Sequence, residues 1–300
     1  LTFKASWLNQ EAWQGHLVSK AWPWQFDEGQ KLDAEWQNIN RSLQGIGLVQ
    51  SHHGNVSFNG TPQRYHLNLN TRATTAKTPE GLWQITGQGQ KQQFNFANLD
   101  YQGMAGHLHG DGQFSWPQGL TWYANVTVDD FKTTSWLAKW PAQLTGKTQS
   151  SGVWRSNQRQ LNFSQTALKG ELKALPLQMS GDLSLDLTNA GQLPYFQAHQ
   201  LVMDWDKNHL AVEGGFNNKW DVTIDSQLDD LSAIDERLKG QLSGVVVVQG
   251  DKKTPSLTLN LAGEALQFQQ MAVSSLSVSG TLPELGAGAG FLQISAKNLT

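Results

Sequence analysis

Hydrophobic and polar residues alternate one by one along most of this 300-residue chain. In the stretch Trp220-Asp-Val222-Thr-Ile224-Asp225 the apolar side chains fall at every second position. Successive side chains of a β-strand point to opposite faces of its sheet, so this pattern predicts a strand with one apolar face and one face in water. The same alternation predicts strands at 67–70, 120–129, 181–188, 201–206 and 257–261. Because antiparallel sheets tolerate one solvated face, we predict an all-β fold of mostly antiparallel strands.

Helical periodicity is confined to one short, recurring element. The segment Ser232-Ala-Ile-Asp235 has the hydroxyl and the acid of a capping box and predicts one or two helical turns. The Asp-Asp pairs at 129–130 and 229–230 each come just before such an element, where a carboxylate can accept hydrogen bonds from free backbone N–H groups. We therefore interpret both pairs as helix caps and not as paired carboxylates for acid–base chemistry.

The short element belongs to an irregular internal repeat. Related segments begin at Phe3, Phe131 and Leu231, each followed by a strand punctuated by glycine, and the tail leads toward a fourth start at Leu299. Repeats of this kind build elongated structures in which each module packs on its neighbours. We therefore predict that residues 1–300 form a single elongated, repeat-built β fragment of a longer chain, and not a globule of two domains. The start at Leu1 instead of methionine fits this expectation.

Composition narrows the classes of function. The chain carries 22 Lys and Arg against 25 Asp and Glu, and this net charge of −3 lacks the basic surface that nucleic-acid binding needs. With 13 Trp and 12 Phe, it has too much apolar surface to stay disordered. The absence of cysteine excludes disulfides, thiolate metal sites and a cysteine nucleophile. The most apolar run, 245–248, is far shorter than the roughly 20 residues of a membrane-spanning helix.

Few residues suggest chemistry. His107, His109 and Asp111 share one face of a predicted strand at a spacing that suits a metal ion. The sequence offers no fourth ligand nearby, so we interpret them as water-facing residues opposite the apolar Leu108. The adjacent histidines at 52–53 predict a turn. We expect no metal site.

Other motifs of catalysis are missing. The glycine clusters at 45–47 and 286–290 precede no helix, which is unlike a phosphate-binding loop. No nucleophile has an obvious base, so we predict no enzymatic activity, no catalytic residue and no cofactor. The tryptophans could form a stacking platform for sugars or bases. Trp122, Trp205 and Trp220 alternate in phase with aliphatic residues, however, which favours packing on the apolar face.

The order of these motifs resembles one known family. An alternating strand, an Asp-Asp-Leu or Asp-Asp-Phe step, a short helix and a Leu-x-Gly-x-Leu-x-Gly strand are followed by Gly250-Asp-Lys-Lys-Thr-Pro255 and the strand at 257–261. Leu168-Lys-Gly170-Glu-Leu172 and Asn208-His-Leu210-Ala-Val212-Glu-Gly214 continue the pattern. This order resembles the periplasmic repeat region of the TamB-like proteins, inner-membrane subunits of the translocation and assembly module that are related to the AsmA-like family. We expect the family's membrane anchor and C-terminal domain to lie outside this fragment.

The resemblance implies an elongated, curled, antiparallel-rich sheet, a taco-like trough with an apolar inner face and one or two short helices. It also implies the periplasmic region of an inner-membrane-anchored protein of Gram-negative bacteria, with phospholipid as cargo between the two membranes and an outer-membrane barrel subunit as partner. Each acyl CH₂ exposed to water costs about 0.8 kcal/mol, so an apolar trough would keep the chains dry. The expected lining comprises Trp122, Val126, Val128, Leu183, Leu185, Leu187, Leu201, Met203, Trp205, Val222, Ile224, Leu257, Leu259 and Leu261.

Three other functions fit the same alternation. A chaperone for outer-membrane protein assembly could pair exposed sheet edges with client strands by β-augmentation. A carbohydrate-binding module would use tryptophans on the wet face, which the in-phase tryptophans disfavour. A filled β-sandwich array with a purely structural role is the third alternative.

Overall fold

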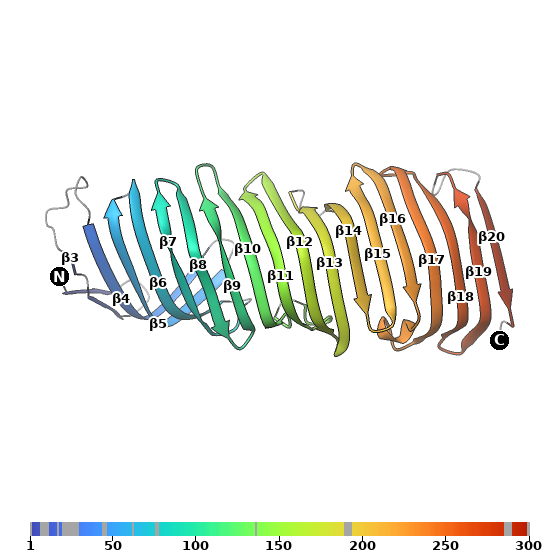
Figure 1. Ribbon diagram of the computed structural model, residues 1–300, viewed down its shortest axis with the longest axis horizontal. Coiled ribbons are helices and arrows are strands. Elements are labelled where there is room, and N and C mark those ends of the chain that lie inside the picture. The colour runs from blue at the N-terminus through green and yellow to red at the C-terminus, as the bar shows by residue number, and fades with distance from the viewer. Residues whose placement is uncertain are drawn as a thin grey trace. The chain divides into compact units, whose positions relative to one another are not determined.

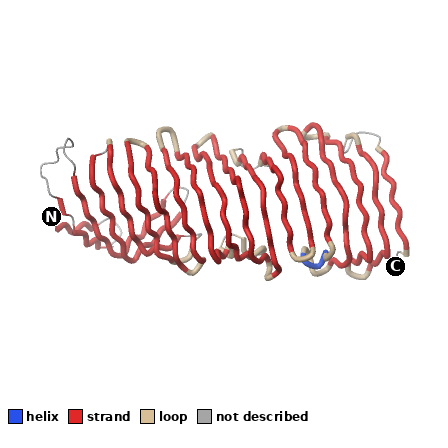
Figure 2. The backbone as a smooth tube through the Cα atoms, in the orientation of Figure 1, coloured by secondary structure: helices blue, strands red, loops and turns tan. Residues whose placement is uncertain are grey.

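The computed structural model describes residues 2–6, 12–16, 18–19, 30–43, 47–61, 63–75, 78–135, 137–188, 194–284 and 290–298. The chain groups into two compact units, Leu1–Ser156 with Gly170–Ala174 and Asn157–Lys169 with Leu175–Thr300. Apart from the two N-terminal strands, the strands of each unit lie side by side in the order of the sequence (Figure 1). Strands dominate the described residues, and their one helix is the three-residue 3₁₀ turn η1 (Leu231–Ala233), blue in Figure 2.

The first unit is an antiparallel sheet in which each strand from β3 to β11 pairs with the next. The strands β1 and β2 form a separate antiparallel pair. The bounds are β1 (Thr2–Ser6), β2 (Ala12–His16), β3 (Val18–Ser19), β4 (Gln30–Leu43), β5 (Gly47–Thr61), β6 (Arg64–Thr75), β7 (Gly81–Gln90), β8 (Gln93–Gly103), β9 (Gly106–Ser115), β10 (Leu120–Lys132) and β11 (Ala142–Arg155).

The second unit repeats this arrangement, with every strand from β13 to β20 antiparallel to its neighbour. The strand β12 contributes residues up to Lys169 to this unit. The bounds are β12 (Gln158–Leu172), β13 (Leu175–Asp186), β14 (Tyr195–Trp205), β15 (Asn208–Asn217), β16 (Lys219–Leu228), β17 (Leu238–Asp251), β18 (Pro255–Phe268), β19 (Met271–Leu282) and β20 (Phe291–Lys297).

The predicted all-β, antiparallel fold class is confirmed. All of the predicted strands fall inside observed ones, within β6, β10, β13, β14, β16 and β18, apart from residues at their ends. The observed strands are longer, because several continue through register shifts; β13, for example, runs on through a shift between Ser180 and Asp182. No helix in the described residues is long and apolar enough to cross a bilayer.

Aromatic rings lie over glycines on one face of the first unit. Tyr101 on β8 is fully buried, and a Cβ added at Gly81 on the neighbouring strand would overlap its ring. The ring of Tyr65 covers Gly89 in the same way. Because glycine leaves room for a ring to lie flat, Tyr101 loses contact with water and Tyr65 becomes half-buried while both stay on a single sheet.

The cap of η1 confirms one of the two predicted aspartate caps. Asp230, and not Ser232, is the N-cap: its carboxylate accepts hydrogen bonds from the backbone N–H of Ser232 (2.9 Å) and from the Ser232 hydroxyl (2.6 Å). Asp235 does not close a capping box, since its carboxylate pairs instead with Arg237 at 2.6 Å. A buried amide fixes the cap from the other side, as Asn208 donates to the carbonyl of Asp230 (3.0 Å) and accepts from its N–H (2.9 Å).

Replacing Asn208 with alanine is expected to lower the free energy of unfolding by about 2 kcal/mol or more, because it leaves two backbone groups of Asp230 without partners. Only 4% of Asn208 is exposed, so water cannot readily replace the lost amide. Denaturant unfolding followed by circular dichroism measures the change. The control is Asn260→Ala, at an exposed asparagine of β18. An equal loss in both variants would refute the role of Asn208.

Stability of the second unit is expected to fall as the pH drops below about 4, the ordinary range for aspartate. Hydrogen bonds from the side chain and then the backbone of Ser232 lower the pKa of Asp230. A carboxylate whose pKa is lowered on folding stabilises the fold above its unfolded pKa, and this contribution disappears as the pH falls through the folded pKa. Asp230→Asn keeps a good cap but cannot titrate, so its unfolding free energy should decline less between pH 5 and pH 2. Identical declines would contradict this expectation.

The other predicted cap is wrong. Asp129 and Asp130 lie within β10, where the register shifts between Val128 and Phe131, and no described helix follows them. Asp130 has a φ of 54°, the left-handed conformation that aspartate tolerates better than most residues. Its N–H is bonded to the Thr145 hydroxyl (3.0 Å) on β11. The pair therefore forms a β-bulge, in which an aspartate is as suitable as in a helix cap.

The predicted turn at 52–53 is also wrong, because both histidines lie inside β5, at a register shift between Ser51 and His53. The glycine positions 45 and 286–289 and the repeat start at Leu299 lie outside the described residues. The repeat starts remain predictions. Two of them, Phe131 and Leu231, are buried at 6% and 7% exposure.

Candidate functional site

The second unit presents a continuous apolar face. Strand registers align its residues in five rows that run across β14 to β18. Each row of cross-strand partners is called a rung below. In the central rung Leu201, Val212, Ile224, Val246 and Leu259 lie opposite one another in turn. The parallel rungs are Phe196–Phe216–Trp220–Gly250–Pro255, Ala198–Gly214–Val222–Val248–Leu257, Met203–Leu210–Ser226–Gly244–Leu261 and Trp205–Asn208–Leu228–Leu242–Gly263.

No charged residue occupies these rungs, and their two polar side chains are already bonded. The Ser226 hydroxyl donates to the carbonyl of Gly244 (3.1 Å), and Asn208 holds the backbone of Asp230 as described. The exposure of this face varies along the sheet. Val222 is 4% exposed, whereas Ile294 of β20, which continues the rung of Met203, is 60% exposed. The rungs therefore form an apolar surface with no unsatisfied polar side chain.

The opposite face of the same strands is polar. His199 Nδ1 lies 2.8 Å from a carboxylate oxygen of Glu213, and His209 Nδ1 lies 2.6 Å from one of Asp204. Hydrogen bonding to Glu213 raises the pKa of His199. The N–H of Gln200, followed by His199, lowers the pKa of Glu213. Each strand thus has one wet and one apolar face, as its alternation predicts.

The first unit has its own apolar face. Phe94, Phe96 and Ala124 form one buried cluster, against which Val126 packs. Tyr101, Ala105 and Phe131 form a second, against which Val128 packs. Ring contacts connect the strands: Phe96 and Phe114 are stacked with centroids 4.8 Å apart, and Trp83 and Tyr101 are tilted with centroids 4.7 Å apart.

The structure brings the expected lining residues of the second unit onto one face. Leu183 and Leu185 on β13 pair with Ala198 and Phe196 of the rungs, whereas Leu187 follows the end of β13 and donates its N–H to the carbonyl of Arg159 (2.7 Å). Leu201, Met203, Trp205, Val222, Ile224, Leu257, Leu259 and Leu261 all belong to the rungs. Their role in lining a lipid trough remains a prediction.

In the first unit, Trp122, Val126 and Val128 share one face of β10, and the Trp122 indole donates to Ser150 (3.1 Å). Trp205 is buried at 3% exposure, and Trp122 and Trp220 are half-buried in line with apolar neighbours. The predicted packing of these three tryptophans is confirmed. Trp116 and Trp154, in contrast, are both 41% exposed.

Several residues of the apolar faces escaped prediction. Phe216, fully buried, follows two glycines that interrupt the alternation. Val246 and Val248 belong to a run of four valines, which hides the period of two. A glycine that lies beneath an aromatic ring, as Gly81 lies beneath the ring of Tyr101, was the available signal.

The histidines at 107 and 109 and Asp111 lie on the face of β9 opposite Leu108, as predicted. His107 Nε2 lies 2.7 Å from a carboxylate oxygen of Asp100, and Asp111 accepts a hydrogen bond from Asn125 (2.9 Å). Over the described ranges, no three His, Asp or Glu side chains are grouped so that they could hold a metal ion.

Comparison with known proteins identifies the family of the chain. The family described as the TamB N-terminal domain matches residues 11–300, nearly the whole chain. The chain belongs to the TamB family. The translocation and assembly module subunit TamB of Haemophilus influenzae is 24% identical to this TamB-family chain over 221 residues. That alignment covers 74% of the chain but only 17% of the relative, so the chain spans less than a fifth of the relative's length. No solved structure gives a significant match.

Proposed function

We propose that the apolar face of this TamB-family chain carries the acyl chains of phospholipids. The observation that carries the proposal is the set of uncharged rungs, in which polar side chains are rare and internally bonded. A sliding acyl chain needs a surface without charges or free polar groups, because each would have to lose its water as the lipid passes. The wet opposite face keeps such a protein compatible with an aqueous compartment.

The size of the surface fits an acyl chain. Five rungs are separated by four intervals of two residues, which is about 27 Å along the strands. One leaflet of a bilayer core is about 15 Å deep, so a lipid tail fits within this width. Covering the tail recovers about 0.8 kcal/mol per CH₂, which makes a charge-free surface sufficient without a catalytic group.

Family membership supplies the cellular setting of the proposal. The curated relative is named as a subunit of a translocation and assembly module. We place the chain in the periplasmic part of an inner-membrane-anchored protein, where it moves phospholipid toward the outer membrane together with an outer-membrane barrel subunit. The rival function is strand capture from outer-membrane proteins during assembly.

Site-specific photocrosslinking in the full-length protein separates the two functions. A photoreactive phenylalanine analogue replaces Leu259 in the central rung, and a matched probe replaces Asn260, the next residue, on the opposite face. Lipid carriage predicts phospholipid adducts at position 259 and at least tenfold fewer at 260. Peptide adducts at 259 without lipid, or equal lipid labelling at both positions, would overturn the proposal.

A further inference from the structure

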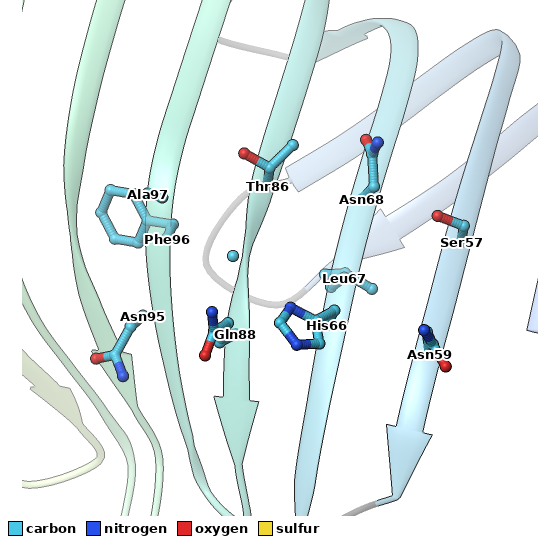
Figure 3. Close-up of a pocket in the computed structure, with 11 residues that line it drawn as sticks. Ser57, Asn59, His66, Leu67, Asn68, Thr86, Gln88, Asn95, Phe96 and Ala97 are labelled. Atoms are coloured by element: carbon cyan, nitrogen blue, oxygen red, sulfur yellow. The ribbon is translucent and has the colours of Figure 1, made fainter. Parts of the chain in front are cut away.

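The first unit contains a cavity that the proposed lipid path does not use; polar side chains make up most of its lining, which Leu67, Gly87, Phe96 and Ala97 complete. Its volume is about 490 Å³, within the range of about 300–1,000 Å³ that is usual for small-molecule sites. Figure 3 shows its side chains arranged across β5, β6, β7 and β8. The registers align Asn59, His66, Gln88 and Asn95 in one rung, with Ser57, Asn68 and Thr86 in the next.

An irregularity in the sheet accompanies this hollow. The pairing of β7 with β8 shifts between Thr86 and Gly87, so that Ala97 is an extra residue on β8. A bulge of this kind bends its strand and strengthens the local twist. Both Thr86 and Ala97 line the cavity, so the hollow and the bulge coincide.

The polar lining is neutral and largely unpaired. It holds no Asp, Glu, Lys or Arg. Asn95 accepts a hydrogen bond from Gln93 (3.2 Å), whereas Asn59, Asn68 and Gln88 make no side-chain hydrogen bond within the described part of the chain. Each of these amides offers both donors and an acceptor at fixed positions along a strand.

From this arrangement we infer that the cavity is a binding site for a neutral oligosaccharide. A sugar hydroxyl is both donor and acceptor, so adjacent hydroxyls complement a row of carboxamides. The lack of cationic side chains gives no charge complementarity to phosphate groups, which disfavours lipid headgroups and nucleic acid. The His66 ring offers a flat surface for the carbon face of a sugar ring. This site uses amides, and so differs from a tryptophan platform.

A second cavity, within the second unit, provides the comparison. It has a volume of about 350 Å³ and is also lined by Gln and Asn side chains, including Gln160 and Gln197. Its groups are already engaged, since Gln160 donates to Asp186 (3.0 Å) and Tyr195 donates to Asn218 (2.6 Å). Asp186 also makes this cavity acidic. Of these two cavities, the first combines a neutral lining with side-chain amides that make no hydrogen bond within the described residues.

The test is calorimetric titration of the 300-residue chain with neutral tetrasaccharides of three linkage types, namely cellotetraose, maltotetraose and chitotetraose. We expect at least one to bind in the millimolar range or tighter. Asn68→Ala combined with Gln88→Ala removes two hydrogen-bonding groups and should weaken that binding about tenfold or more. Gln197→Ala, in the second cavity, is the matched control and should leave it unchanged.

Both substituted side chains are exposed, so the double variant should keep the wild-type circular dichroism spectrum and unfolding midpoint. The isosteric variant Asn68→Asp removes two hydrogen-bond donors and adds a negative charge. Its affinity for the same sugar is a second test, and it should also be lower than that of the wild-type chain. Failure of all three sugars to bind, or equal affinity in the wild-type chain and these variants, would overturn the inference. The result does not depend on lipid carriage, because the cavity is built from β5–β8 of the first unit, whereas the apolar rungs belong to β14–β18 of the second.

Discussion

Introducing arginine at Ile224 is expected to reduce the phospholipid that copurifies with the chain by about tenfold or more. Ile224 lies in the central rung between Val212 and Val246, so its replacement places a guanidinium in the middle of the apolar face. A lipid tail passing this point would have to strip water from a charge, which costs several kcal/mol. Lipid extraction and mass spectrometry of wild-type and variant chains measure the loss.

The control for this variant is the adjacent residue. Thr223 is exposed on the opposite face, where it pairs with Glu213 and Val247, so Thr223→Arg adds the same charge without touching the rungs. It should retain wild-type lipid content. In the full-length protein, Ile224→Arg should also impair lipid transport, whereas Thr223→Arg should not. Normal transport in a stably expressed Ile224→Arg protein would contradict the account.

Truncation of Tyr101 to alanine is expected to destabilise the first unit by about 3–5 kcal/mol, the usual cost of deleting a buried aromatic side chain. The ring is fully buried, and the hydroxyl donates to the carbonyl of Pro79 (3.2 Å) and accepts from the N–H of Ala105 (3.4 Å). Tyr101→Phe keeps the ring and should cost only about 1 kcal/mol. Denaturant unfolding measures both values.

A double-mutant cycle tests whether the ring's position over glycine is the cause. Valine at Gly81 would collide with the Tyr101 ring and should strongly destabilise the wild-type chain. In the Tyr101→Ala background the ring is gone, so Gly81→Val should cost far less. Additive losses in the cycle would mean that the two residues do not interact and would refute the packing assigned to them.

The sequence predicted the strands because their physical cause is local. Alternation at residues 220–225 and 257–261 places each side chain on a face, and the antiparallel registers then align those faces. Register shifts were not predicted. The shift at Asp129 and Asp130 depends on a bond from Asp130 to Thr145 on the next strand, which no window of sequence around the pair contains.

The two Asp-Asp pairs show that neighbouring sequence alone does not determine the local structure. The same Asp-Asp-apolar step caps η1 at Asp230 and forms a bulge at Asp130. The difference is tertiary, because a buried Asn208 bonds the backbone of Asp230 whereas Thr145 bonds that of Asp130. The polar cavity also escaped prediction, since Asn68 and Gln88 become neighbours only through the pairing of β6 with β7.

The most direct test of the account is lipid mass spectrometry on this chain purified without detergent, beside an unrelated β-protein prepared in the same way. The account predicts stoichiometric phospholipid with the chain and none with the control, and a loss of that lipid in Ile224→Arg but not in Thr223→Arg. A stable, lipid-free chain would contradict it, and would mean that the apolar rungs pack against protein and do not carry lipid.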